Sequence, residues 1–320
     1  MGKTKQKRPN HKGRAFRIWR HRVFYLFLLP AAAVLVFFNF IPTVATVMLS
    51  FKDFNLMAGI WQSHWNGLAN FERIIVNLRD FTSVVGNTLS ISVLRLCFGF
   101  FPPIIFAILL FDIRANWYRR LAQSITYLPH FFSWVIVYGL VFMLLTPGMG
   151  LLPNILRQLG MSNPPGFLLD SRWYRPLFVA AGIWKELGWG TIIYMAALVG
   201  IDKELFEAGA MDGVGVLQRI RYIILPSLKP VMILLLTLSM GSLFSAGFEQ
   251  SLLFSNSSNI MVSDIIETWV YRTGMVSADF NLATAVGLAQ SVIGIVLIVT
   301  ANWVAKRTTG MGLYGTGDRS

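Results

Sequence analysis

Residues 23–51 read VFYLFLLPAAAVLVFFNFIPTVATVMLSF, a stretch without a single charged residue. A helix needs about 20 apolar residues, at roughly 1.5 Å each, to cross a bilayer. A cleaved signal peptide would have a shorter apolar region, of about 7–15 residues. The stretch therefore predicts a retained first transmembrane helix, which Pro30 and Pro42 kink or delimit.

The rest of the chain has the same apolar character. Of its 320 residues, 55% are hydrophobic and 13% are charged, whereas soluble domains carry about 25% charged residues. The sequence therefore predicts an all-α polytopic membrane protein with six transmembrane helices. The five apolar segments that follow the first lie at about residues 84–111, 122–145, 177–200, 230–248 and 283–304.

The net charge of +13 is a signal that basic nucleic-acid-binding proteins share, but its placement favours a membrane. Nine of the 28 basic residues lie in the first 22 positions, directly before the first apolar segment. With both termini in the cytoplasm, nineteen basic residues fall on the cytoplasmic side and seven on the outer side, as the positive-inside rule requires. We predict an N-in/C-in topology and no nucleic-acid partner. The predicted regions are a basic tail at 1–22, a transmembrane domain at 23–305 and a second cytoplasmic tail at 306–320.

Residues 201–226, between the fourth and fifth predicted spans, read IDKELFEAGAMDGVGVLQRIRYIILP. Asp202 is suited to cap a short helix, and Gly213 permits the sharp turn that ends it. A second amphipathic helix would follow and stop at Pro226. We predict two short helices joined at a glycine, within a cytoplasmic loop of residues 201–229. By its physical properties alone, such a loop is an interfacial linker.

This loop resembles the EAA loop of binding-protein-dependent ABC importers. The family pattern is Glu-Ala-Ala, three residues, Gly, nine residues, Ile, one residue and Leu-Pro; the chain departs from it at Gly209 and Val214. The resemblance implies the type I ABC importer permease fold, in which the loop is a coupling helix that docks on an ATP-binding subunit. Glu207 would be the anchoring charge, and Asp212 with Gly213 would set the turn. The coupling residues implied by the match are Glu207, Ala208, Asp212, Gly213, Leu225 and Pro226.

Further segments resemble the complex-carbohydrate branch of these permeases. They are YLPHFFSW at 127–134, WKELGW at 184–189, IYMAA at 193–197, GFEQ at 247–250 and ATAVG at 283–287. The likeness covers about residues 20–307 and implies import of an oligosaccharide across a bacterial cytoplasmic (inner) membrane. A permease subunit for alginate is one specific candidate.

The resemblance also implies a set of partners. They are a second and different permease subunit, two ATP-binding subunits that hold ATP and Mg²⁺, and an extracytoplasmic solute-binding protein. The binding protein would dock on the outer loops at 52–83, 147–175 and 249–282. The chain itself would hold no cofactor.

Three charged residues fall inside predicted spans, where charges usually mark a pathway or a buried pair. In the related maltose permease, substrate contacts come from the spans that correspond to the fourth and fifth here. Aromatic rings beside charged groups suit sugars, which present both C–H faces and hydroxyls. The candidate pathway residues are Trp184, Lys185, Glu186, Trp189, Ser239, Ser242, Ser245 and Arg95.

Two interpretations of the intramembrane charges remain open at this point. Arg95, Lys185 and Glu186 either pair with protein groups or contact the substrate. In the second case, two cations against one acid favour an acidic, uronate-type sugar.

The sequence indicates no catalytic chemistry. It lacks a P-loop of the form G-x-x-x-x-G-K-[ST], and His11, His21, His64 and His130 are too scattered for a metal site. A secondary, ion-coupled transporter is the alternative function; it would explain the charges but not the loop at 201–226. The inverted repeats with broken helices that mark such transporters are not evident. A receptor or scaffold without a transport role would not explain the intramembrane charges.

Overall fold

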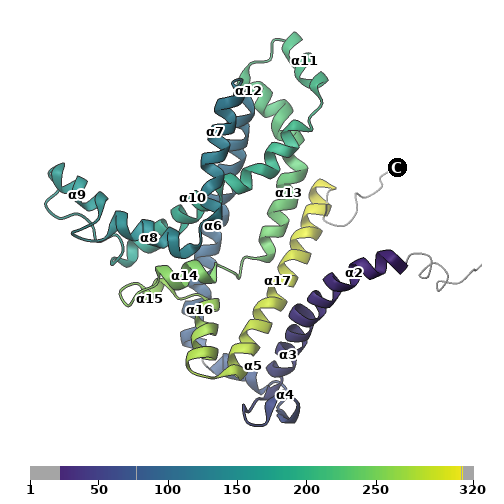
Figure 1. The fold of residues 1–320 in the computed structure, drawn as a ribbon, viewed down its shortest axis with the longest axis vertical. Helices are drawn as coiled ribbons and strands as arrows, with labels where there is room; N and C mark the ends of the chain where they lie inside the picture. The colour runs from purple at the N-terminus through teal and green to yellow at the C-terminus, as the bar shows by residue number, and fades with distance from the viewer. Residues whose placement is uncertain (1–21, 77, 311, 313–320) are drawn as a thin grey trace, which may run out of the picture.

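The computed structural model describes residues 22–76, 78–310 and 312, and this part of the chain is almost entirely helical (Figure 1). Two short strands, β1 (Lys52–Asp53) and β2 (His64–Trp65), pair as an antiparallel hairpin. The helical elements are α2 (Arg22–Leu35), η1 (Val36–Phe40), α3 (Ile41–Ser50), α4 (Gly59–Gln62), α5 (Ala69–Val76), α6 (Leu78–Asp112), α7 (Asn116–Tyr127), η2 (Leu128–Phe131), α8 (Trp134–Leu145), α9 (Leu151–Gln158), α10 (Ser171–Val199), α11 (Lys203–Met211), α12 (Val216–Arg219), η3 (Ile220–Ile224), α13 (Leu225–Gly241), α14 (Phe248–Phe254), α15 (Ile260–Ser263), α16 (Ile266–Tyr271), η4 (Arg272–Val276) and α17 (Phe280–Thr309).

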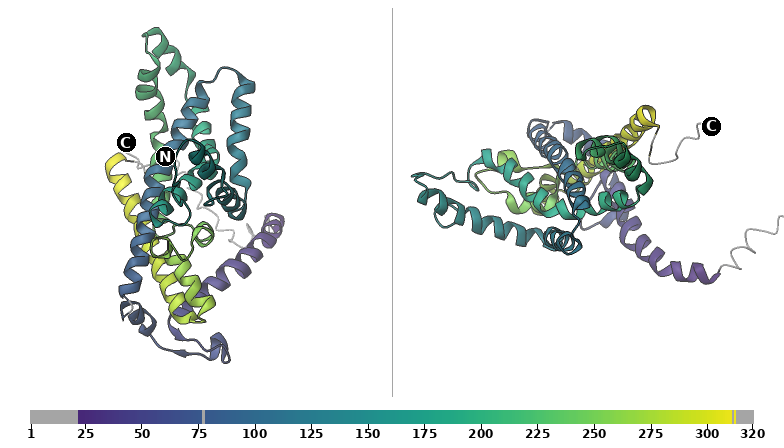
Figure 2. Two further views of the ribbon diagram at one scale, coloured as in Figure 1. Left: turned by 90° about the vertical axis from the view of Figure 1, so that its left-hand side faces the viewer. Right: turned by 90° about the horizontal axis from the view of Figure 1, so that it is seen from above.

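The molecule is elongated, with α11 and α12 at one end and α4 and α5 at the other (Figure 1). Two parts diverge from the body: α2 on one side, and the arm formed by α8 and α9 on another (Figures 1 and 2). The surface of α2, η1 and α3 is strongly apolar, with Phe27 of α2 79% exposed and Phe38 of η1 75% exposed. Water would penalise such a surface heavily, so these helices require lipid or a partner subunit around them.

Within the described residues, four helices are long and apolar enough to cross a membrane: 22–50, 81–112, 216–241 and 280–309. The bent pair formed by 116–131 and 134–145 would be a fifth. The predicted span at about 177–200 lies on α10, which has sufficient length but carries Lys185 and Glu186. The fold is therefore a helical membrane protein with four to five candidate spans.

The prediction of one continuous helix at about 122–145 is wrong. The chain bends by 103° between 116–131 and 134–145, because η2 ends in extended backbone at Phe132 and Ser133. Pro129 has no N–H with which to continue an α-helical ladder. Ser133 then starts α8 as its N-cap, since its hydroxyl accepts from the Ile136 N–H at 3.4 Å.

The prediction that Pro226 stops the helix before the fifth span is also wrong. The chain runs helically through 216–241, and the helix ends at Gly241 instead of near residue 248. A proline ring clashes with the carbonyl four residues earlier, which here belongs to Tyr222. The wide π-helical turn η3 lies around this carbonyl and changes the helix geometry just before Pro226. The same arrangement occurs in the first span, where η1 precedes Pro42.

Three buried apolar clusters hold the body together. One joins α6, α10 and α13 near the α11 end through residues such as Ile108, Leu198 and Leu228. A second joins α6, α8, α10 and α14 around Phe178, and a third joins α6, α16 and α17 around Val286. Between the first two clusters, α6 and α10 also contribute polar residues, and a cavity lies there.

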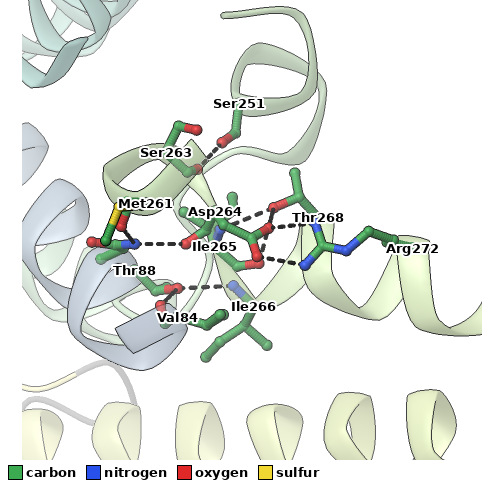
Figure 3. A network of polar contacts seen from close by, with 11 residues as sticks. Val84, Thr88, Ser251, Met261, Ser263, Asp264, Ile265, Ile266, Thr268 and Arg272 are labelled. Atoms are coloured by element: carbon green, nitrogen blue, oxygen red, sulfur yellow. Dashed lines mark hydrogen bonds and ion pairs between the residues drawn. The ribbon is translucent and has the colours of Figure 1, made fainter. Parts of the chain in front are cut away.

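A polar network fixes α15 and α16 against α6 (Figure 3). Asp264 accepts from Thr268 and pairs with Arg272 at 2.6 Å. Thr88 of α6 accepts from the Ile266 N–H at 2.9 Å, and the hydroxyl of Ser251 donates to the Ser263 carbonyl. Because most of these groups are buried, each bond makes separation of the elements costly. These bonds therefore hold the start of α16 in a fixed position against α6.

Asp279 caps the last helix, and we expect its loss to destabilise the protein in a pH-dependent way. Its carboxylate accepts from the Leu282 N–H and pairs with Arg73 at 2.5 Å. Partial burial opposes ionisation, but these bonds outweigh it and hold the pKa of Asp279 below its ordinary value of 3.8. A carboxyl group whose pKa is depressed in the folded protein stabilises the fold at pH values above its ordinary pKa. This stabilisation is lost as the pH falls through the depressed pKa.

The Asp279→Ala variant should therefore lower the free energy of unfolding by about 1 kcal/mol at neutral pH. The deficit should shrink when the pH falls below 3.8. Thermal unfolding of the purified protein at both pH values checks this. An equal loss of stability at the two pH values would show that the charge of the Asp279 carboxylate does not contribute to the stabilisation.

Candidate functional site

A cavity of about 570 Å³ lies between α6, α10, α13 and the connection that follows α13. It occupies the polar zone between two of the apolar clusters, because its α6 and α10 residues fall between those that build the clusters. Its size is within the range of small-ligand sites. Six of the eight predicted pathway residues line it: Arg95, Glu186, Trp189, Ser239, Ser242 and Ser245.

Trp184 and Lys185 do not line this cavity. The Lys185 side chain is 8% exposed, and its ammonium donates to the His130 carbonyl at 2.6 Å. The ammonium also lies 3.6 Å from the Glu186 carboxylate and 5.6 Å from the centroid of the Trp134 ring. The Lys185 ammonium is therefore not part of the cavity lining, and Arg95 is the cationic side chain that lines the cavity.

Arg95 is held by a close contact with the 242–247 connection. Its Nη1 donates to the Ala246 carbonyl at 2.6 Å, and its guanidinium lies 6.0 Å from the centroid of Phe178. Gly247 has φ +101°, and a Cβ there would lie 2.7 Å from Arg95 Nη1. Only glycine fits that conformation and that approach.

Glu267 holds the same connection from α16, a role that the sequence did not indicate. Its carboxylate accepts from the Ser245 hydroxyl at 2.5 Å and from the Gly247 N–H at 3.1 Å. Gln290 of α17 donates to the Phe244 carbonyl. The connection follows the candidate span that ends at Gly241, and side chains supply the bonds that its backbone needs in an apolar surrounding.

His130 is a second residue that sequence reasoning missed. Its Nδ1 lies 2.9 Å from Glu186 Oε2, and its ring stacks on Trp189 with centroids 4.4 Å apart and planes within 3°. The stretch 127–134 contained the only available signal. This stretch resembles known permeases, but the resemblance does not assign its histidine to the site.

The loop at 201–226 forms the predicted pair of short helices, although the second continues into α13. The Asp202 carboxylate caps α11 by accepting from the Glu204 N–H at 3.0 Å. Gly213 has φ +72° and makes the turn that ends α11. Gly209, one departure from the family pattern, allows close packing, since a Cβ there would lie 3.0 Å from Ile223 Cδ1.

The six predicted coupling residues are all exposed. Four of them lie on α11 or directly after it, at one end of the molecule (Figure 1), whereas Leu225 and Pro226 begin α13. Inward contacts come from other side chains of the loop. Phe206 packs on Phe111 with ring centroids 5.8 Å apart, and Arg219 pairs with Asp112 at 2.6 Å. These contacts attach the loop to the end of α6, a helix that also lines the cavity. Among the described residues, no group of His, Cys, Asp and Glu is arranged to hold a metal ion.

Comparisons with known proteins give a consistent result. Residues 99–310 match the family described as "Binding-protein-dependent transport system inner membrane component". Protein LplB of Bacillus subtilis is 40% identical over 295 residues, which cover 92% of each chain. The polygalacturonan/rhamnogalacturonan transport system permease protein YteP of the same organism is 36% identical, with 96% of this chain and 95% of YteP covered.

A solved structure shares the fold. One chain of a bacterial alginate ABC transporter, crystallised in complex with an alginate pentasaccharide-bound periplasmic protein, superposes with a TM-score of 0.84. It is 33% identical to this chain, and the match covers 93% of this chain and 99% of the other.

Proposed function

Since the chain belongs to the family of binding-protein-dependent transport system inner membrane components, we propose that it translocates an acidic, uronate-type oligosaccharide delivered by an extracytoplasmic binding protein. The chain is a permease subunit of a sugar ABC importer. The observation that carries the finer proposal is the cavity that gathers Arg95, Glu186 and Trp189. None of the relatives described above is a secondary transporter, so that alternative has no support.

The substrate class rests on two independent supports. One relative is named for polygalacturonan and rhamnogalacturonan, and the structural neighbour transports alginate. In the cavity, the Arg95 guanidinium is suited to a carboxylate, because its planar donors match carboxylate geometry. Trp189 offers an aromatic surface for the C–H face of a sugar ring.

The assembly that we propose follows the predicted topology. The chain crosses the inner membrane six times, with α10 and the bent α7–α8 segment among the spans, and both termini lie in the cytoplasm. A second, different permease subunit would complete the pathway. Two ATP-binding subunits would hold ATP and Mg²⁺, and one of them would dock on the exposed face of α11, so that the chain contributes no catalysis. The exposure of the predicted coupling residues supports this docking.

Uptake by the complete complex in proteoliposomes tests the substrate class. With the binding protein outside, we expect ATP-dependent uptake of trigalacturonate and little uptake of its neutral methyl ester. Arg95 is the physical reason, because a half-buried guanidinium disfavours a partner that cannot neutralise it. Equal uptake of the two trimers would contradict the acidic assignment. Uptake that follows an ion gradient without ATP would contradict the importer itself.

Trp189→Ala should reduce trigalacturonate uptake about thirtyfold, since an aromatic anchor that becomes buried against its ligand is worth about 2 kcal/mol. Trp184→Ala is the matched control, because Trp184 lies on the same helix with a similar exposure, 45% against 48%, but does not line the cavity. Initial uptake rates measure both variants. Equal losses in the two would show that the cavity does not define the pathway.

A further inference from the structure

We propose that His130 is a positioning residue that fixes the ring of Trp189 and the carboxylate of Glu186 as one rigid sugar-recognition unit on the cavity wall. The proposal rests on the proposed function, because it assumes that the sugar passes through this cavity. His130 itself does not line the cavity, whereas Glu186 and Trp189 do.

The stacked contact defines how the indole is presented. The His130 and Trp189 rings are 4.4 Å apart and nearly parallel, and Phe131 meets Trp189 edge-on at 6.4 Å. With the imidazole against one face of the indole, the opposite face is the one left for a ligand. A ring held on one side loses little freedom when a sugar binds to the other, so less of the binding energy is lost to ordering.

The carboxylate of Glu186 is fixed at both oxygens. Oε2 lies 2.9 Å from His130 Nδ1, and Oε1 lies 3.6 Å from the Lys185 ammonium. The ammonium also donates to the His130 carbonyl at 2.6 Å. Lys185 therefore ties the backbone of His130 to the same helix that carries Glu186 and Trp189. His130, Glu186 and Lys185 therefore each contact the other two, and these contacts join η2 to α10.

Close packing of the segment 116–131 on α10 makes this arrangement possible, because His130 lies on that segment and the bend follows it. Gly188 of α10 lies so close to Thr126 that a Cβ would be 2.2 Å from the Thr126 carbonyl oxygen. Backbone contact at Gly188 thus places His130 over Trp189, one residue further along α10.

The unit of His130, Glu186 and Trp189 makes the α10 side of the cavity acidic, whereas Arg95 makes the α6 side basic. Glu186 and Trp189 are three residues apart on α10 and share a face. A sugar ring stacked on Trp189 would donate its hydroxyls to Glu186, while like charge keeps a uronate carboxylate away from it. The carboxylate would then turn toward Arg95 on α6. His130 therefore determines the orientation of an acidic sugar without contacting it.

The test is a double-mutant cycle on the complete complex in proteoliposomes, with trigalacturonate and the binding protein. His130→Ala should lower the uptake rate about tenfold in the wild-type background, and should lower it little further in a Trp189→Ala background. Such non-additivity reports coupling between the two residues, which a general loss of stability would not produce. An equal tenfold loss in both backgrounds, or no loss in the wild-type background, would overturn the proposal.

Two conservative variants separate the contacts and remain informative if His130→Ala does not assemble. His130→Phe keeps an aromatic ring on Trp189 but cannot reach Glu186 with a polar atom, so Glu186→Gln should add less loss to it than to the wild type. His130→Asn keeps a polar group for Glu186 but not the stack, so Trp189→Ala should add much less to it than its thirtyfold loss in the wild type. Full additivity in both pairs would overturn the proposal.

The outcome also distinguishes this inference from the proposed function. If Trp189→Ala and Glu186→Gln each transport like the wild type, the cavity is not the pathway, and the proposed function fails together with the inference. If both lose transport while all three His130 variants retain it, the proposed function stands and the positioning role is rejected.

Discussion

A Gly188→Ala variant is expected to lose about 3 kcal/mol of stability and nearly all transport. The new Cβ would lie 2.2 Å from the Thr126 carbonyl oxygen and 2.8 Å from Tyr127 Cδ1. The first of these is a backbone atom, so no side-chain rotation relieves the overlap, and the cost falls at the upper end of the range for overpacking. The helices α7 and α10 must separate, which also moves His130 from Trp189. The thermal unfolding temperature of the purified complex should fall by roughly 5–10 °C.

Gly182→Ala is the matched control on the same helix. A Cβ at residue 182 would meet Gln250 at 3.7 Å, an ordinary van der Waals distance, and alanine favours a helix over glycine. This variant should unfold at or above the wild-type temperature. If both variants unfold at the wild-type temperature, the close contact of α7 with α10 is not present in the protein.

Glu207→Arg is expected to abolish ATP-driven uptake while the chain still inserts and assembles. Glu207 is exposed on α11, so reversing its charge leaves the packing of the loop on α6 unchanged, but places a cation where an anchoring carboxylate is proposed. A loss of about 100-fold corresponds to the 2–5 kcal/mol expected when one partner of an interfacial charge pair is removed. Uptake and ATPase rates in proteoliposomes, compared with the amount of assembled complex, measure the uncoupling.

Glu204→Arg controls for charge alone, because it is the same reversal one turn earlier on α11. It should cost only a few tenths of a kcal/mol through the helix dipole and retain most uptake. Equal losses in Glu204→Arg and Glu207→Arg would reject the specific role of Glu207.

Gly213→Pro should uncouple transport by a different route. Proline fixes φ near −65°, whereas Gly213 has φ +72° and donates its N–H to the Ala210 carbonyl at 3.2 Å. The turn that orients α11 would not form. Wild-type uptake by this variant would contradict the role of the loop as a rigid connection.

Local features of the loop at 201–226 were predictable from sequence because they depend on neighbours in the chain. A carboxylate at Asp202 bonds an N–H two residues away, and glycine at 213 accepts a positive φ at no steric cost. The prolines were harder to interpret. Pro129 lies at a break, whereas Pro226 is accommodated inside a continuous helix by a π-helical turn, and the difference depends on the turn that precedes each one.

The candidate cavity was predictable only in part. The spacing of Glu186 and Trp189, or of Ser239, Ser242 and Ser245, places each set on a common face. Spacing does not say which way a face turns, so Lys185 was grouped with Glu186 although its ammonium points behind the wall. The contacts of His130 and Glu267 join residues 56 and 22 positions apart, and no local pattern signals them.

The sequence by itself determined that this chain is a helical membrane protein of the importer family, because hydrophobic length and a contiguous loop motif are properties of the chain alone. The tertiary structure decided which of the intramembrane charges meet in one cavity, and which residues hold them there. Those relations follow from the packing of the segment 116–131 on α10 and from the close approach at Gly188, where contacts between distant segments set the directions of side chains.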